Sequence, residues 1–265
     1  MNILEKKMFD HLKNLRDNFG VLGVKAEFEA EGTRIDELLR LVEITSKANL
    51  KLGIKIGGCE AMKDLMEVKQ IGTDYVIAPM IESEYALIKF IQSKNKVFDK
   101  VEQKFCDFLI NIETIQAFKN LEKIIEAHNL HKNESIKGIV FGRVDFSLSN
   151  HLSRESINDS DVTKYVIEVA KICKKNSLDL VVGGGISLEA ISALKEINNT
   201  YLTRFETRKI IFSSDALKLQ NLSEGMIEAV KFELLWLKNK KSYYDNISKE
   251  DDSRIEMLSK RWIDK

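Results

Sequence analysis

The sequence alternates between short apolar runs and longer segments with helical spacing. The short runs are rich in β-branched and aromatic residues and are apolar at consecutive positions, as expected for strands that are buried on both faces. They occupy residues 21–29, 52–58, 75–80, 104–113, 138–146, 178–185 and 208–213. Between them, apolar residues recur at i, i+3 and i+4, as Leu121, Ile124 and Ile125 do. This alternation predicts a parallel sheet that is covered by helices.

An open, doubly wound sheet and a closed barrel would both produce such an alternation. No GxGxxG follows the first predicted strand, and GxxxxGK[ST] does not occur, so the commonest nucleotide signals of open sheets are missing. The 265 residues suit a barrel of roughly 250 residues. We therefore predict an α/β fold, a TIM-type (β/α)8 barrel, over residues 1–213. Only seven strands are evident, so the first strand would be degenerate, lying within the first 20 residues or replaced by a helix there.

Residues 214–265 form a predicted C-terminal helical extension. The segment "MIEAVKFELLWL" carries an apolar stripe at i, i+3, i+7 and i+10, made of Ile227, Val230, Leu234 and Leu237. Trp236 and Trp262 add large apolar side chains. The extension could pack on its own barrel or on a neighbouring subunit. Because the helix is apolar on more than one side, we expect a homo-oligomer, at least a dimer, with the region after about residue 222 in the interface.

The charge balance excludes several classes of protein. Lys plus Arg and Asp plus Glu both number 41, so neither nucleic acid nor an anionic membrane is an expected partner. No apolar run reaches the roughly 18 residues that span a bilayer. The charged segment "MNILEKKMFDHLKNL" lacks the apolar core of a signal peptide. The three cysteines are scattered without a CxxC, which suits a reducing compartment, and we expect a cytoplasmic protein.

The predicted strands end in an unusually polar rim. In a parallel barrel the active site lies at the carboxyl ends of the strands. The residues at or near these ends include Glu27, Glu29, Lys55, Gly57, Gly58, Pro79, Glu113, Arg143 and Asp145. Carboxylates in such positions are costly to desolvate unless they are paired or bind a cation.

Glu113 and Asp145 each follow an apolar run and have no His or Cys companion. Two such carboxylates make a hard oxygen site of the kind that Mg²⁺ or Mn²⁺ prefers. They could instead cap the helices that follow, or pair with Arg143 and Lys55. Spacing alone leaves both interpretations open.

The segment "INIETIQAFKNLEKI", followed by "IKGIVFGRVDFSLS", resembles the HpcH/HpaI aldolase and citrate lyase beta-subunit family. The segment "IKIGGCEAMKDLMEVKQIGTDYVIAPMIESEYAL" is similar to another part of that family. The resemblance runs from about residue 21 to about residue 185. It implies a metal-dependent barrel enzyme in which Glu113 and Asp145 hold a divalent metal, Mg²⁺ or Mn²⁺, that binds pyruvate or its enolate.

The sequence departs from the family pattern at four positions near this site. Lys55 stands where the family usually has an Arg that grips the pyruvate carboxylate, and Lys supplies charge without a bidentate fork. Ala30 occupies the position of the family's His. Asn111 replaces a Gln, and Arg143 replaces the Pro of "G-P-x-D". The metal pair is kept while the acid–base residues differ.

The resemblance implies a carbon–carbon lyase that acts on a pyruvate-like 2-oxo acid and an aldehyde. Lys55 would add positive charge near the enolate oxygen, and Glu27 or Glu29 would move a proton. Gly57 and Gly58 would let the substrate approach the backbone, with Arg143 and Pro79 as further substrate-binding residues. One alternative is a lyase for acyl-CoA thioesters such as citryl-CoA or malyl-CoA. The other is a barrel that has lost catalysis and serves in binding or assembly.

Two further segments could bind anions. "VVGGGIS" offers backbone amides near the start of a helix, although a tight strand–helix turn explains the same glycines. "TRFETRK" gathers Arg204, Arg208 and Lys209 around Glu206, either as a substrate-anion site or as an ion-paired edge.

Overall fold

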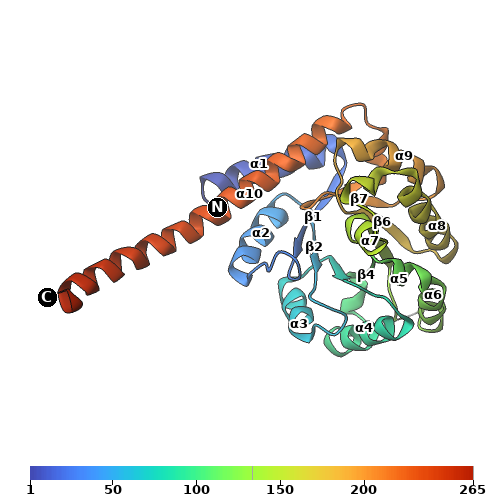
Figure 1. Ribbon diagram of the computed structural model, residues 1–265, viewed down its shortest axis with the longest axis horizontal. Helices are drawn as coiled ribbons and strands as arrows, with labels where there is room; N and C mark the ends of the chain where they lie inside the picture. The colour runs from blue at the N-terminus through green and yellow to red at the C-terminus, as the bar shows by residue number, and fades with distance from the viewer. Residues whose placement is uncertain (133, 265) are drawn as a thin grey trace.

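The computed structural model describes residues 1–132 and 134–264. Eight strands close into a barrel in chain order, with helices around it (Figure 1). The strands are β1 (Val21–Glu27), β2 (Lys51–Lys55), β3 (Tyr75–Ala78), β4 (Asp107–Ile112), β5 (Gly138–Gly142), β6 (Asp179–Gly183), β7 (Arg204–Glu206) and β8 (Ile210–Ser213). The α-helices are α1 (Ile3–Phe19), α2 (Ile35–Lys47), α3 (Met62–Ile71), α4 (Glu84–Val97), α5 (Ile115–Lys119), α6 (Leu121–Leu130), α7 (Arg143–Ser149), α8 (Ser160–Asn176), α9 (Ile191–Thr200) and α10 (Leu222–Leu258).

The predicted barrel is confirmed, but its eighth strand is not where the sequence suggested. The first 20 residues contain helix α1, and β1 is a regular strand of seven residues rather than a degenerate one. The missing strand is β7, which lies before the last predicted run, 208–213, and was not predicted as a strand. Only Thr207, Arg208 and Lys209 separate the two strands, and a parallel crossover needs a dozen residues or more. β8 therefore runs antiparallel to both of its neighbours, β7 and β1.

The barrel interior is apolar in its lower part. Side chains from five strands form a separate buried cluster there, made of Tyr75, Ile77, Leu109, Val140, Val181 and Ile211. A larger core lies between the strands and the surrounding helices. The cluster fills the barrel below the carboxyl ends of the strands, so the polar residues at those ends lie above a closed apolar floor.

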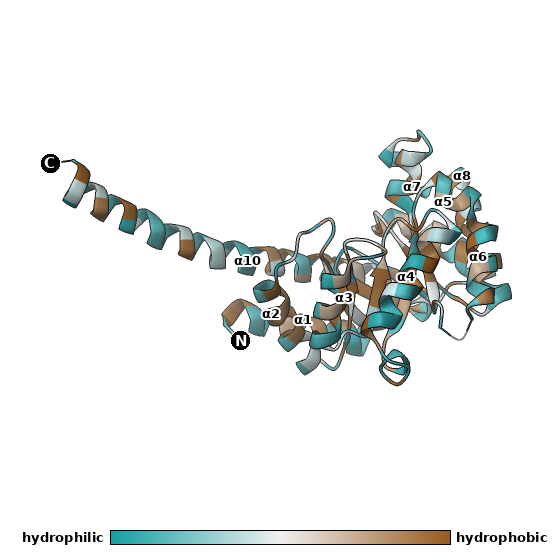
Figure 2. Cartoon of the chain, turned by 90° about the horizontal axis from the view of Figure 1, so that it is seen from below, coloured by the Kyte–Doolittle hydropathy of each residue, from teal (hydrophilic) through white to brown (hydrophobic). Residues whose placement is uncertain are grey.

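Helix α10 both covers the barrel and extends beyond it. Its first half packs along α1, where Met226, Phe232 and Trp236 are buried. Its second half projects away from the barrel (Figures 1 and 2). The described helices include none that is long and apolar enough to cross a membrane.

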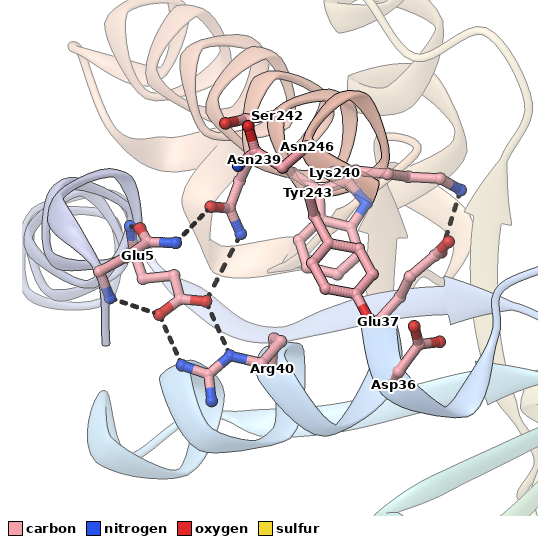
Figure 3. Close-up of a pocket in the computed structure, with 11 residues that line it drawn as sticks. Glu5, Asp36, Glu37, Arg40, Asn239, Lys240, Ser242, Tyr243 and Asn246 are labelled. Atoms are coloured by element: carbon pink, nitrogen blue, oxygen red, sulfur yellow. Dashed lines mark hydrogen bonds and ion pairs between the residues drawn. The ribbon is translucent and has the colours of Figure 1, made fainter. Parts of the chain in front are cut away.

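The N-terminus of α1 is joined to α2 and α10 by one buried carboxylate (Figure 3). Glu5 accepts from Nε of Arg40 at 2.8 Å and from Nη2 at 2.6 Å. The backbone N–H of Asn2 donates to it at 2.7 Å, and Asn239 contacts it at 3.5 Å. These hydrogen bonds, with those from Arg40 the largest cause, lower the pKa of Glu5 to about 2. The network lines a cavity of about 410 Å³ between the three helices.

We expect Glu5→Gln to lower the free energy of unfolding by about 2–3 kcal/mol at pH 7, from the size of the pKa shift. Because the folded pKa is depressed, this stabilisation is present above the ordinary pKa near 4.5 and is lost as the pH falls toward 2. The difference between the variant and the wild type should therefore shrink between pH 7 and pH 3. Denaturant titrations at both pH values measure it. Asp161→Asn, at an exposed ion pair, is the control and should change little. A pH-independent difference would contradict this account.

The predicted apolar stripe lies on the surface of α10. Ile227, Val230, Leu234 and Leu237 are each between 47% and 53% exposed. We propose that a second copy of the chain covers them. Light scattering of the intact chain at micromolar concentration should then report at least a dimer, and replacing both Leu234 and Leu237 with Glu should reduce the mass to that of one chain. Leu130→Glu, at an exposed position on α6, is the control that should leave the mass unchanged. A monomeric wild type would rule out the interface.

Candidate functional site

A cavity of about 530 Å³ opens at the carboxyl ends of the barrel strands. Its charged lining comes from Lys25, Glu27, Glu29, Lys55, Glu113, Asp145, Arg154, Glu206, Arg208 and Glu233. Five of the nine residues predicted at the strand ends are thus brought together, namely Glu27, Glu29, Lys55, Glu113 and Asp145, and Glu206 and Arg208 of the segment "TRFETRK" join them. Val230 and Glu233 come from α10, so the C-terminal helix forms part of the wall.

Lys25 on β1 stands at the centre of the first ion-pair group in the cavity. Its Nζ lies 2.5 Å from Oε1 of Glu206 on β7 and 3.1 Å from Oε1 of Glu27. Burial opposes the charged form of Lys25, but the two carboxylates outweigh it and raise the lysine pKa. Burial likewise works to raise the pKa of Glu27, and Lys25 reverses this, so the net pKa is lowered. Both side chains therefore stay charged at neutral pH.

Lys55 at the end of β2 connects Glu29 with Glu113. Its Nζ lies 2.9 Å from Oε2 of Glu29 and 3.2 Å from Oε2 of Glu113. Burial works against the ammonium, yet the charge of Glu113 and the hydrogen bond to Glu29 raise the net pKa of Lys55. The amine is therefore held protonated. This arrangement suits Lys55 to stabilising negative charge and not to attacking a carbonyl, which needs the neutral amine.

Glu113 follows β4 directly and is almost fully buried. Asn111 donates to its Oε2 at 2.6 Å, and the backbone N–H of Met80 donates to its Oε1 at 3.0 Å. Met80 has a φ of 50°, a left-handed conformation that is uncommon for a side chain of this size. Gly142 at the end of β5 lies against the carboxylate, since a Cβ there would be 2.9 Å from Oε2 of Glu113.

Asp145 does not lie on a strand, contrary to the predicted run 138–146. β5 ends at Gly142, and Asp145 is in the first turn of helix α7. Its side chain is exposed to the cavity, and it forms no ion pair with any of the residues that the structure describes. Burial, followed by the negative charge of Glu113, raises the pKa of Asp145. The two carboxylates therefore repel each other, which favours a cation in their vicinity.

The charges of the cavity lining do not balance. Six carboxylates stand against four cationic side chains, a formal excess of two negative charges. The described residues contain no group of three or more His, Cys, Asp and Glu side chains that could hold a metal alone. Mg²⁺ needs no such group, because one or two carboxylates hold it together with waters and substrate oxygens. The donor set of Glu113 and Asp145 therefore fits a hard divalent cation.

Four of the predicted substrate-binding residues are not in the cavity lining. Arg143 is 1% exposed and directs its guanidinium into the protein, where burial lowers its pKa to about 10. Gly57 donates its N–H to Asp64 at 2.7 Å. Gly58 and Pro79 also lie outside the lining.

The sequence analysis missed Lys25 and the paired role of Glu206. Lys25 and Glu27 are two apart on one strand, so their side chains point to the same, inward face. This spacing could have identified them. The contribution of α10 left no such signal, because it depends on how the last helix crosses the barrel.

The comparisons with known proteins agree with the fold and identify the family. A model of the HpcH/HpaI aldolase/citrate lyase family matches residues 29–191. The chain belongs to the HpcH/HpaI aldolase/citrate lyase family. The family and the fold indicate an enzyme of the aldolase/citrate lyase type. Within the matched segment lie both Glu113 and Asp145, whereas Lys25, Glu206 and α10 fall outside it.

Two solved structures share the fold. An HpcH/HpaI aldolase from Desulfitobacterium hafniense matches with a TM-score of 0.56 at 12% identity, over 78% of this chain and 82% of its own. An HpcH/HpaI aldolase/citrate lyase family protein from Burkholderia cenocepacia matches with a TM-score of 0.55, also at 12% identity, over 84% of this chain and 99% of its own. A search of curated proteins gave no match.

The contact between Gly142 and Glu113 leads to a stability prediction. Gly142→Ala should destabilise the protein by about 1–3 kcal/mol, because the added methyl overlaps a buried carboxylate that is held on both oxygens. Gly58→Ala is the matched control, since a Cβ there meets no atom within 4 Å. Thermal unfolding of the two variants makes the comparison. Equal stability of the two variants would show that the Glu113 side chain moves freely.

Proposed function

We propose that this protein is a divalent-metal-dependent carbon–carbon lyase that makes or breaks a bond at the enolate of a pyruvate-like 2-oxo acid, with an aldehyde as the second substrate. The observation that carries the proposal is the pair Glu113 and Asp145 in one cavity whose lining has a formal excess of two negative charges. Membership of the family supports the reaction type. Mg²⁺ or Mn²⁺ held by these two carboxylates would supply Lewis-acid stabilisation of the enolate charge.

The side chains around the pair have separate roles in this proposal. Lys55 keeps its charge through Glu29 and Glu113 and adds a second positive group near the enolate oxygen. Asn111 and the N–H of Met80 fix the orientation of Glu113. The rigid carboxylate then needs no reorganisation during the reaction.

A proton must leave or reach the substrate carbon, and Glu29 is the better candidate for moving it. Glu27 is held by Lys25, and its lowered pKa makes it a weak base. Glu29 lies on the bend after β1, is partly exposed to the cavity, and has Lys55 as its ion-pair partner. Movement of Lys55 toward substrate would free its carboxylate.

The proposal can be tested without knowing the aldehyde, by following the exchange of pyruvate methyl protons for deuterium in D₂O. With Mn²⁺ or Mg²⁺ the wild type should exchange these protons, as followed by mass spectrometry of pyruvate. Glu113→Gln and Asp145→Asn should abolish exchange and weaken Mn²⁺ binding in a titration, because each removes a ligand charge. Lys55→Met should slow exchange by a factor of about 10²–10³, as expected for the loss of one oxyanion partner.

Glu60→Gln provides the control for this series, since Glu60 is a surface carboxylate that pairs with Lys89 outside the cavity. It should retain both exchange and Mn²⁺ affinity. Full Mn²⁺ affinity in both ligand variants would refute the metal assignment. A wild type that binds Mn²⁺ but never exchanges pyruvate protons would refute the enolate chemistry.

A further inference from the structure

The turn after β6 has two adjacent glycines in left-handed conformations. Gly184 has a φ of 80° and Gly185 a φ of 62°. Both lie in the cavity lining together with Ile186. A Cβ on Gly184 would be 2.7 Å from the backbone nitrogen of Arg143, and one on Gly185 would be 2.3 Å from a methyl of Ile157. Backbone atoms leave no room for a Cβ at Gly184, and the left-handed φ of both residues would strain any other side chain.

Arg143 binds this turn on the side away from the cavity. Its Nη2 donates to the carbonyl of Gly184 at 3.0 Å and to that of Gly185 at 3.2 Å. Its Nη1 donates to the carbonyl of Ile157 at 3.2 Å and to Oδ1 of Asn158 at 2.9 Å. One buried guanidinium thus joins the glycine turn to the short helix Arg154–Asn158.

This clamp decides where the amides of the turn point. The described peptide bonds are all trans, so each N–H points opposite to the carbonyl of the preceding residue. With the carbonyls of Gly184 and Gly185 facing Arg143, the N–H groups of Gly185 and Ile186 face away from it. Arg143 is outside the cavity lining, whereas Gly185 and Ile186 are within it. Neither N–H has a hydrogen-bond acceptor among the described residues.

A cationic side chain lines the same cavity from the clamped helix. Arg154 begins the segment that carries Ile157 and Asn158, and it forms no ion pair with the residues that the structure describes. Two free N–H donors and an unpaired guanidinium attract an oxyanion and offer nothing to a neutral or apolar group.

We propose that Arg143 is a positioning residue that presents the N–H groups of Gly185 and Ile186 to an acid group, carboxylate or phosphate, on the second substrate. This inference rests on the proposed function, because it narrows the aldehyde to one that carries a negative charge. In the proposed function the 2-oxo acid binds at the metal that Glu113 and Asp145 would hold, and the glycine turn is assigned to the acid group of the second substrate.

Amide NMR of the metal-free protein provides the test. In wild type, titration with inorganic phosphate or with malonate should produce saturable shifts of the Gly185 and Ile186 resonances, and the anion that binds more tightly identifies the acid group. Arg143→Met should weaken this binding at least about tenfold, since two oriented donors are lost. Arg143→Lys, which keeps the charge, should restore part of it.

Arg204→Met is the matched control, because Arg204 is also buried but pairs with Asp179 at the start of β6. It should leave the anion affinity unchanged. If neither anion shifts Gly185 and Ile186 in wild type, the proposal is wrong, and this result does not depend on any variant folding. Unchanged affinity in Arg143→Met would also overturn it. The NMR titration contains neither metal nor pyruvate, so its result does not depend on the lyase function. If the wild type shows saturable amide shifts but does not exchange pyruvate protons, the lyase function is refuted and the anion site stands.

Discussion

Lysines and carboxylates meet inside the barrel above the apolar cluster, and the upper half of the fold depends on how they neutralise one another. Lys25 joins β1 to Glu206 on β7, and Lys55 joins β2 to Glu113 after β4. The free energy of desolvating such pairs offsets much of their attraction, so they add little net stability. Removal of one partner nevertheless destabilises the protein, because it leaves an uncompensated buried charge. They are better understood as fixing orientation. Among the described carboxylates that line the cavity, Asp145 and Glu233 form no ion pair.

The short β7–β8 hairpin gives this barrel a rim that eight parallel strands would not provide. Because β8 runs antiparallel, its beginning faces the cavity, and the turn at Arg208 and Lys209 lies where a strand would otherwise end. Both side chains form ion pairs with Glu31, which follows β1. These ion pairs join the turn between β7 and β8 to the segment after β1. The antiparallel strand closes the barrel and also adds a cationic edge to the site.

The sequence predicted the barrel because strands that are buried on both faces and alternate with amphipathic helices allow few other folds. It located Glu113 because a carboxylate directly after an apolar run can be recognised in the sequence alone. It failed where two elements meet in space. Arg143 donates to carbonyls some forty residues away in the chain, which its own segment does not reveal. The wrong strand assignment for Asp145 arose because "RVDF" is apolar enough to extend β5. The three-residue spacing between β7 and β8 could have predicted the hairpin.

The closing hairpin also contacts the C-terminal helix. The ammonium of Lys209 lies 5.7 Å from the ring centre of Trp236 on α10, a cation–π contact in a buried setting. Lys209 is held by Glu31, and Arg208 beside it lines the cavity. The turn between β7 and β8 therefore contacts the segment after β1, the cavity and α10. The same helix contributes Glu233 to the cavity and Leu234 to the exposed apolar stripe. A second copy that covers the stripe, as we propose, would therefore contact the same helix that lines the cavity.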